Sequence, residues 1–397
     1  MKTLAALRQF QRNAWLFLAS NFIGATGYTI FFLILNLYLA RIGLGKEAIS
    51  WVNAAVWLAG GLLCIPMSFV FERMPRKWAW FIFTFLQGGI TCLFVLFTTP
   101  IPLIICAFFL GAGYTIFLVL TSPFIVENST PKERLHLFSW NYVLIWIASV
   151  LGYLLGGVLP GWLMFGAGEI SGFRWSLVLA AFLYCVAALP FLFLRSYRHP
   201  RGGGFSLRIS LGPQAWKYML TVLIAMIGAG LFVPFLNLFL DTRGFSTQAI
   251  GLVFTLGSVA TTFTTIGSPW LAVRFGRIGA LSLTQVMTLP FFLILAFAQA
   301  PIWLGTAYIF RQALVNMGGP LGDSFSMDLV PENSRASFAA LQASVRSLSW
   351  GFTAPIAGWV MQGFGFTWLF LAAAILYLTS AGLLWGFFRR KDQAAAH

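Results

Sequence analysis

Hydrophobic residues occur along the chain in long blocks that short polar clusters separate. A bilayer core about 30 Å thick is crossed by about 20 residues of α-helix, which rises 1.5 Å per residue. Helices are expected because hydrocarbon offers no hydrogen-bond partner to a free backbone amide. The pattern therefore predicts an all-α polytopic membrane protein with twelve transmembrane helices, at residues 14–40, 47–70, 78–98, 101–125, 137–164, 174–194, 215–240, 247–272, 279–299, 301–326, 336–363 and 367–388.

Polar and glycine positions repeat along the chain at an offset of 201 residues. The segment Asn36-Leu-Tyr-Leu-Ala-Arg-Ile-Gly43 follows the first predicted helix, and Asn237-Leu-Phe-Leu-Asp-Thr-Arg-Gly244 follows the seventh. The same offset relates Arg73 to Arg274, Arg76 to Arg277, Glu127 to Asp328, Arg134 to Arg335, Asn141 to Gln342 and Gly157 to Gly358. The repeat predicts two six-helix bundles, residues 1–194 and 215–397, related by a pseudo-two-fold axis along the membrane normal.

The only long polar segment, residues 195–214, contains Arg-His-Pro-Arg-Gly-Gly-Gly and is predicted to be a cytoplasmic linker between the bundles. With the N-terminus inside, the cytoplasmic segments hold 19 of the 25 lysines and arginines, and the outer loops hold 4. Basic residues concentrate on the cytoplasmic side of membrane proteins. We therefore expect a multi-pass protein of the cell (plasma or inner) membrane with both termini in the cytoplasm.

Composition supports this class of protein. Charged residues make up 9% of the chain, whereas soluble domains carry about 25%. The net charge of +15 lies in predicted loops, so it is explained by helix orientation and no nucleic-acid partner is expected. The four cysteines are dispersed, no Gly-x-x-x-x-Gly-Lys-Ser/Thr loop is present, and no catalytic cluster is apparent. We expect neither a cofactor, a metal nor an enzymatic activity.

Acids and bases cluster at the predicted cytoplasmic helix ends. The loop after the second helix reads Glu72-Arg73-Met-Pro75-Arg76-Lys77, and its repeat reads Val273-Arg274-Phe-Gly276-Arg277. An acid followed by Arg seven positions later ends the fourth helix (Glu127, Arg134) and the tenth (Asp328, Arg335). One exposed ion pair contributes only ~0–1 kcal/mol, but a network can bias a two-state equilibrium. We interpret these charges as a gate; anchoring of loops at lipid headgroups is the alternative.

These motifs resemble those of the major facilitator superfamily, whose signature Gly-x-x-x-Asp-Arg-x-Gly-Arg-Arg/Lys lies between the second and third helices. Ser68 and Pro75 replace its glycines, Glu72 replaces its Asp, and Val273 replaces the acid in the second copy. The resemblance implies transport by alternating access, with a weaker or asymmetric cytoplasmic lock. It also implies that the third, sixth, ninth and twelfth helices are peripheral, which argues against Gln87 and Gln285 as ligands.

Three ionisable residues lie at membrane depth, where charge marks a functional site by default: Arg311, Asp323 and Arg346. The arginines' repeat mates are Leu110 and Ile145, so this charge belongs to the second half alone. Guanidinium groups in a central cavity bind carboxylate, phosphate or sulfate. The alternative is structural: an arginine paired with Asp323 or with helix-terminal carbonyls. Asp323 is the candidate for proton coupling.

Further cavity candidates are polar or aromatic residues of the predicted spans, although aromatic residues at helical spacing are more often packing. These candidates are Tyr28, Tyr114, Asn141, Trp146, Gln312, Asn316 and Gln342.

The sequence thus favours a secondary active or facilitative transporter of a small solute, with an anion as the solute class that the arginines suggest. The alternative within this class is a proton-coupled exporter of drugs or lipophilic compounds. Outside it stands a transporter-fold receptor or lipid-moving protein. The expected partners are membrane lipids, the small-molecule substrate and a proton or counter-anion, with the chain as a monomer.

Overall fold

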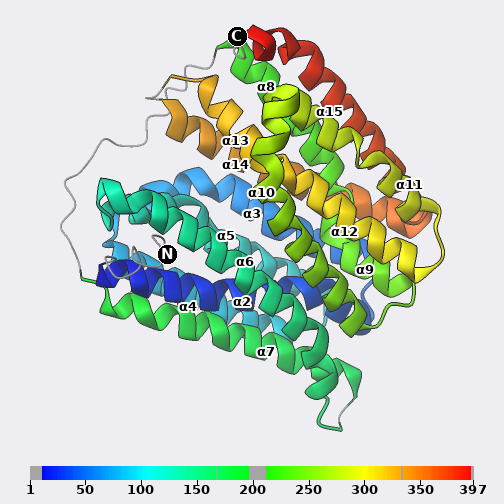
Figure 1. Ribbon diagram of the computed structural model, residues 1–397. Helices are drawn as coiled ribbons and strands as arrows, with labels where there is room; N and C mark the ends of the chain where they lie inside the picture. Colours follow the sequence, from blue (N-terminus) through cyan, green and yellow to red (C-terminus); the bar gives the residue numbers. More distant parts are fainter. Residues whose placement is uncertain (1–10, 167, 196–211, 332–333, 395–397) are drawn as a thin grey trace. The chain divides into compact units, whose positions relative to one another are not determined.

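The computed structural model describes residues 11–166, 168–195, 212–331 and 334–394, and within these ranges all regular secondary structure is helical (Figure 1). The helices are α2 (Arg12–Arg41), α3 (Lys46–Arg73), α4 (Arg76–Leu96), α5 (Pro100–Glu127), α6 (Pro131–Trp162), α7 (Glu169–Ala188), η1 (Leu189–Phe193), α8 (Pro213–Gly230), η2 (Val233–Phe235), α9 (Leu236–Thr242), α10 (Thr247–Val286), α11 (Leu289–Phe297), α12 (Pro301–Met317), α13 (Gly319–Asp328), α14 (Arg335–Gly363) and α15 (Thr367–Ala394).

The predicted helical, polytopic fold is confirmed, and each predicted span falls on helical residues. Within the described residues, nine helical runs are long and apolar enough to cross a membrane. The run Thr247–Phe297 covers two predicted spans, and α12 and α14 are not among the nine. The count of twelve spans therefore stays a prediction.

Two helix interruptions in the second half have no counterpart at the matching positions of the first. The segment α8–η2–α9 is interrupted around Pro234, whereas its repeat mate α2 is continuous. The segment α12–α13 is interrupted at Gly318, whereas α5 is continuous although Pro123 lies inside it. At Gly318 the backbone stays close to helical, its N–H donates to the Val315 carbonyl at 3.3 Å, and its carbonyl accepts from the Gly322 N–H at 3.0 Å, so the interruption is a local change in hydrogen-bond pairing.

The chain forms two compact units by its contacts. The first comprises Met1–Leu44 and Ala55–Gly204, and the second comprises Gly45–Ala54 and Phe205–His397. The first turns of α3 thus group with the second unit, where Lys46 Nζ donates to the Met361 carbonyl at 3.2 Å. The predicted linker, residues 195–214, lies almost wholly outside the described residues, so the predicted bundle boundaries stay a prediction.

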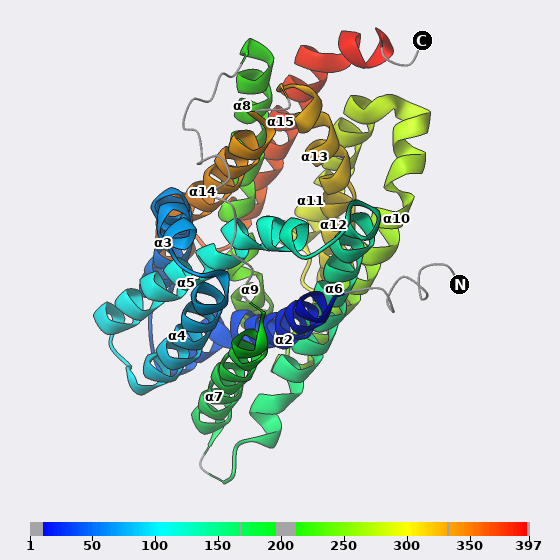
Figure 2. The same cartoon turned by 90° about the vertical axis from the view of Figure 1, so that its left-hand side faces the viewer.

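Within the first unit α2 packs against α6 and α7, and α4 packs against α5 and α7 (Figure 1). Within the second unit α10 packs against α12 and α15, and α8 packs against α14 and α15 (Figure 2). These contacts bring helices that are far apart in sequence into one bundle in each unit.

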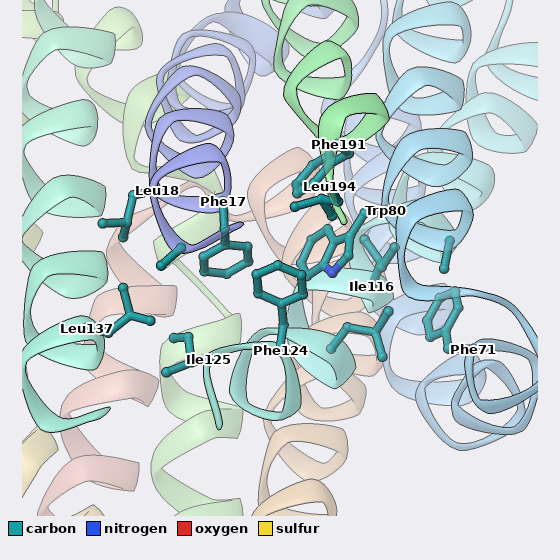
Figure 3. Packing of buried hydrophobic residues seen from close by; sticks show 13 residues of the cluster. Phe17, Leu18, Phe71, Trp80, Ile116, Phe124, Ile125, Leu137, Phe191 and Leu194 are labelled. Carbon is teal, nitrogen blue, oxygen red and sulfur yellow. The ribbon is translucent and has the colours of Figure 1, made fainter. Parts of the chain in front are cut away.

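Each unit has a hydrophobic core, and the two cores follow the 201-residue offset. In the first unit Phe17 packs against Trp80 and Phe124 (Figure 3). Core residues related by the offset are Ala14 and Ala215, Phe17 and Tyr218, Leu18 and Met219, Ala79 and Ala280, Trp80 and Leu281, Leu120 and Leu321, Phe124 and Phe325, and Leu137 and Phe338. The repeat seen in polar residues therefore extends to the packed interior.

A close helix crossing also repeats, with glycine and threonine exchanged. In the first unit, a Cβ built on Gly152 of α6 would lie 2.6 Å from Thr29 Cβ of α2. In the second unit, a Cβ on Gly230 of α8 would collide with Thr353 Oγ1 of α14. Positions 29 and 230, and positions 152 and 353, are repeat mates. Small residues let membrane helices approach closely, so one member of each pair has to be glycine.

The crossing predicts a stability effect. Gly152→Leu should lower the free energy of unfolding by about 1–3 kcal/mol, because the added side chain forces α2 and α6 apart. Gly89→Leu is the matched control, since a Cβ at the exposed Gly89 meets nothing within 4 Å. Thermal unfolding in detergent compares the two; an equal loss in both variants would contradict the account.

Candidate functional site

Two ion pairs occupy repeat-related positions at the helix ends that the sequence predicts to be cytoplasmic. In the first unit Arg76 Nη2 lies 3.1 Å from Glu127 Oε1, and Arg76 also donates to the Phe71 carbonyl. In the second unit Arg277 Nη1 lies 2.6 Å from Asp328 Oδ2. Each pair joins the loop arginine to the acid of the acid-x6-Arg motif within its own unit.

The other motif residues have different surroundings. Arg335 Nε donates to the Met327 carbonyl at 3.2 Å. Arg134 is partly buried, and its Nε has no hydrogen-bond partner among the described residues. Lys77 lies over the Trp78 ring, and Arg274 lies over the rings of Trp270 and Phe275. Arg73 is exposed. The side chain of Glu72 lies outside the described part of the structure.

Arg311 on α12 is a buried cation, with 2% of its surface exposed. Its Nη2 donates to the Tyr377 hydroxyl at 2.9 Å, and its Nη1 donates to Gln312 Oε1 at 3.3 Å. The guanidinium lies 4.4 Å from the ring centroid of Phe232, 5.4 Å from that of Phe292 and 5.6 Å from that of Tyr377. Its partners among the described residues are therefore aromatic faces and neutral oxygens, and cation–π attraction strengthens where water is excluded.

Arg346 on α14 has a different environment. Its Nη2 lies 3.3 Å from Asp323 Oδ1 on α13, and the two side chains are 45% and 66% exposed. The structure thus contains the pair of Arg346 with Asp323 that the sequence offered as the structural alternative. A single contact of this length is weaker than a bidentate pair, so both side chains can exchange partners.

Arg346 also lines a cavity of 180 Å³ inside the second unit. Gly318, Gly319 and Gly322, at the break between α12 and α13, form part of the wall. Tyr377 lines the cavity too, so the hydroxyl that accepts from Arg311 stands between that arginine and the cavity. Other polar lining residues are Tyr218, Thr221, Thr284, Gln285, Asn316 and Ser380.

A second cavity, of 320 Å³, lies inside the first unit. Tyr28 and Tyr114 line it with parallel rings, whose centroids are 5.3 Å apart at an interplanar angle of 15°. Its other polar or aromatic lining residues are Asn21, Thr29, Phe32, Gln87, Phe117, Thr121, Ser149, Tyr153 and Tyr184.

The remaining candidates lie near these cavities but do not line them. Asn141 Oδ1 accepts a 2.7 Å hydrogen bond from Asn21 Nδ2, and so supports a lining residue. Gln342, its repeat mate, is buried and its Nε2 has no partner among the described residues. Trp146 packs on Tyr142. Gln312 accepts from Arg311, and its carbonyl accepts from Asn316.

Gln87 and Gln285 both line a cavity, although helix position argued against them as ligands; whether either binds a ligand stays a prediction. Gln87 on α4 reaches inward because Gly113 of α5 leaves space for it: a Cβ there would lie 2.8 Å from Gln87 Cγ. The amide Nε2 donates to the Leu110 carbonyl at 3.3 Å. The signal in the sequence was a glutamine within an apolar span; the facing glycine is visible only in the structure.

The environment of Arg311 predicts a specific stability effect. Tyr377→Phe removes the hydroxyl that accepts from a buried cation, and should lower the free energy of unfolding by about 1.5–3 kcal/mol. Tyr142→Phe makes the same chemical change at an exposed site and should stay within about 0.5 kcal/mol of wild type. Thermal unfolding of the full chain in detergent measures both. Equal stability of Tyr377→Phe and wild type would show that the hydroxyl does not compensate the charge.

Comparison with known proteins adds the following. A family model described as Major Facilitator Superfamily matches residues 17–354 and 218–397. An uncharacterized MFS-type transporter, YhhS, of Salmonella typhimurium is 27% identical over 257 residues, which are 64% of this chain and 60% of the relative. YhhS of Escherichia coli K12 is 25% identical over 255 residues, with the same coverage. The matched stretch thus spans 60% of the length of these curated relatives.

Solved structures with similar folds cover nearly the whole chain. A bacterial homolog of the human lysosomal transporter Spinster has a TM-score of 0.79 at 14% identity, covering 96% of this chain and 97% of that one. The nucleoside transporter NupG has a TM-score of 0.74 at 15% identity, covering 96% and 100%. A D-xylose–proton symporter has a TM-score of 0.74 at 15% identity, covering 94% and 97%. At these identities the likeness concerns the fold alone.

Proposed function

Because the chain belongs to the Major Facilitator Superfamily, we propose that it is a secondary transporter that moves a small anionic solute across the membrane by alternating access. One observation carries the choice of an anion: a half-exposed arginine, Arg346, lines a cavity beside a broken helix in the second unit.

The cavity chemistry supports an anion over a neutral solute. Arg346 contributes a positive charge, and Asn316 and Gln285 contribute amides to the same wall. A carboxylate, sulfate or phosphate bound there would accept hydrogen bonds from the guanidinium. Such charge-assisted hydrogen bonds are stronger than those between neutral groups.

Asp323 regulates the access of the solute to Arg346. Its carboxylate pairs with the guanidinium that the solute would bind, so Asp323 and the solute compete for Arg346. A proton taken up by Asp323 removes the negative charge and releases Arg346 for the solute. Solute and proton would then move together, with Asp323 as the coupling residue.

Arg311 plays a supporting part in this proposal. It is buried behind Tyr377 and holds that hydroxyl at the cavity wall. Its positive charge lies close enough to the cavity to favour an anion without contacting it.

The ion pairs Arg76–Glu127 and Arg277–Asp328 serve as gating elements in the proposal. Their duplication supports this role, because anchoring of loops at headgroups requires the bases but not the acids. The termini are taken to be cytoplasmic, on the distribution of basic residues. The transporter is taken to act as a monomer in the lipid bilayer.

A proton-coupled exporter of lipophilic compounds is the second candidate, and the tyrosine-lined cavity of the first unit favours it. The solved neighbours include a nucleoside transporter and a D-xylose–proton symporter, so the shared fold accommodates solutes of different chemistry.

Uptake into proteoliposomes tests the main proposal. A panel of carboxylates, phosphate and sulfate should include an anion that wild type transports and that Arg346→Gln transports at least about tenfold more slowly, because a charge-assisted hydrogen bond is lost. Asp323→Asn should remove the dependence of uptake on an imposed pH gradient.

The matched control is Arg12→Gln, which removes an exposed arginine at the start of α2 and should retain wild-type uptake. Equal anion transport by wild type and Arg346→Gln would overturn the anion site. Preferential transport of a lipophilic cation, unaffected by Arg346→Gln, would favour the exporter.

Charge exchange tests the gating pairs. Arg277→Asp places two acids together at the end of α13 and should change the uptake rate by up to about fivefold, which corresponds to ~1 kcal/mol for an exposed pair. The double variant Arg277→Asp with Asp328→Arg restores opposite charges and should return the rate to within about twofold of wild type. Arg12→Asp controls for charge alone. A double variant no better than the single one would contradict the gating role.

A further inference from the structure

The cavity of the first unit is lined by uncharged residues. None of its fifteen lining residues is acidic or basic, and they include Tyr28, Tyr114, Tyr153 and Tyr184. Its volume of 320 Å³ falls within the range of about 300–1,000 Å³ that small-molecule sites occupy. A fully charged group would lose its hydration there without gaining a counter-charge, so an occupant has to be neutral in the part that enters.

Aromatic rings in this cavity lie next to one another. The Tyr28 ring is near-parallel to Tyr114, and it stacks on Phe32 at 5.9 Å and 18°. The Tyr114 ring lies tilted against Phe117 at 6.1 Å and 34°. Aromatic groups prefer such offset, near-parallel contacts with other flat rings. The lining therefore favours a planar occupant over an aliphatic one.

Two amide oxygens of the lining lack a hydrogen-bond partner among the described residues: Asn21 Oδ1 and Gln87 Oε1. The nitrogen of each amide is already engaged, with Asn141 Oδ1 and the Leu110 carbonyl respectively. Buried polar atoms are normally hydrogen-bonded, and an orphaned acceptor is unfavourable. Each oxygen can therefore accept a hydrogen bond from an N–H or O–H donor of a bound molecule.

From these observations we propose that this cavity binds a planar, uncharged ring that carries an N–H or O–H donor. The ring stacks against Tyr28 and Tyr114, and its donor is directed to the amide oxygen of Gln87 or Asn21. The inference goes beyond the proposed function, because every lining residue belongs to the first unit whereas Arg346 belongs to the second.

Binding of two matched probes to the purified full chain tests the proposal. Indole has a flat ring and an N–H donor, and benzofuran has the same shape without the donor. Isothermal titration calorimetry should show that wild type binds indole about two- to tenfold more tightly than benzofuran. Gln87→Leu should remove this preference by weakening indole alone.

Tyr28→Leu should weaken both probes by about two- to tenfold, because the stacking surface is lost. Phe109→Leu is the matched control: Phe109 lies on α5 like Tyr114, but it is exposed and does not line the cavity. It should bind both probes as wild type does.

Three results would overturn the proposal: no binding of indole to wild type, equal affinity of wild type for indole and benzofuran, or equal weakening by Tyr28→Leu and Phe109→Leu. The wild-type comparison stands even where Gln87→Leu fails to fold. Loss of indole binding together with intact anion uptake in proteoliposomes overturns this inference alone. Indole binding without uptake of any anion overturns the proposed function instead.

Discussion

The compensation of positive charge inside a helical bundle is the constraint on which the second unit depends. A guanidinium removed from water is expensive unless its surroundings replace the lost hydration. Arg311 is stabilised by three aromatic rings and the Tyr377 hydroxyl, which come from different helices and are thereby held together. Among the described residues, Arg346 pairs with Asp323, at a half-exposed position. Arg311 is buried among aromatic rings, whereas Arg346 borders a cavity and can change partners. We therefore propose Arg346 as the solute-binding residue.

The internal repeat shows which features are shared and which are specialised. The buried cores, the ion pairs at the helix ends and the Gly–Thr helix crossing all follow the 201-residue offset. Arg311, Asp323 and Arg346, and the helix interruptions near Pro234 and Gly318, lie in the second half. The first half has instead an uncharged cavity with stacked tyrosines. The two repeat-related halves thus contain cavities of different chemistry, one without charged lining residues and one lined by an arginine.

The sequence predicted the parts of the structure that depend on hydrophobicity and on the repeat. Long apolar blocks located the helices, and the fixed offset related Arg76 and Glu127 to Arg277 and Asp328 before any contact was known. It could not predict which way a polar side chain turns inside a bundle. Gln87 reaches a cavity because Gly113 on another helix makes room, and the rings around Arg311 come from Phe232, Phe292 and Tyr377, far apart in the chain. Such arrangements depend on tertiary packing, which the order of residues along one helix does not reveal.

The proposed competition between Asp323 and a solute anion for Arg346 is tested by measuring anion binding to the purified chain as a function of pH. Sulfate and small carboxylates would be titrated calorimetrically into the purified chain at low and at high pH. We expect an anion that wild type binds more tightly at low pH, because a protonated Asp323 would no longer compete for Arg346. We further expect that Asp323→Asn binds this anion equally well at both pH values and that Arg346→Gln does not bind it. A pH dependence that persists in Asp323→Asn, or anion binding that persists in Arg346→Gln, would contradict this competition.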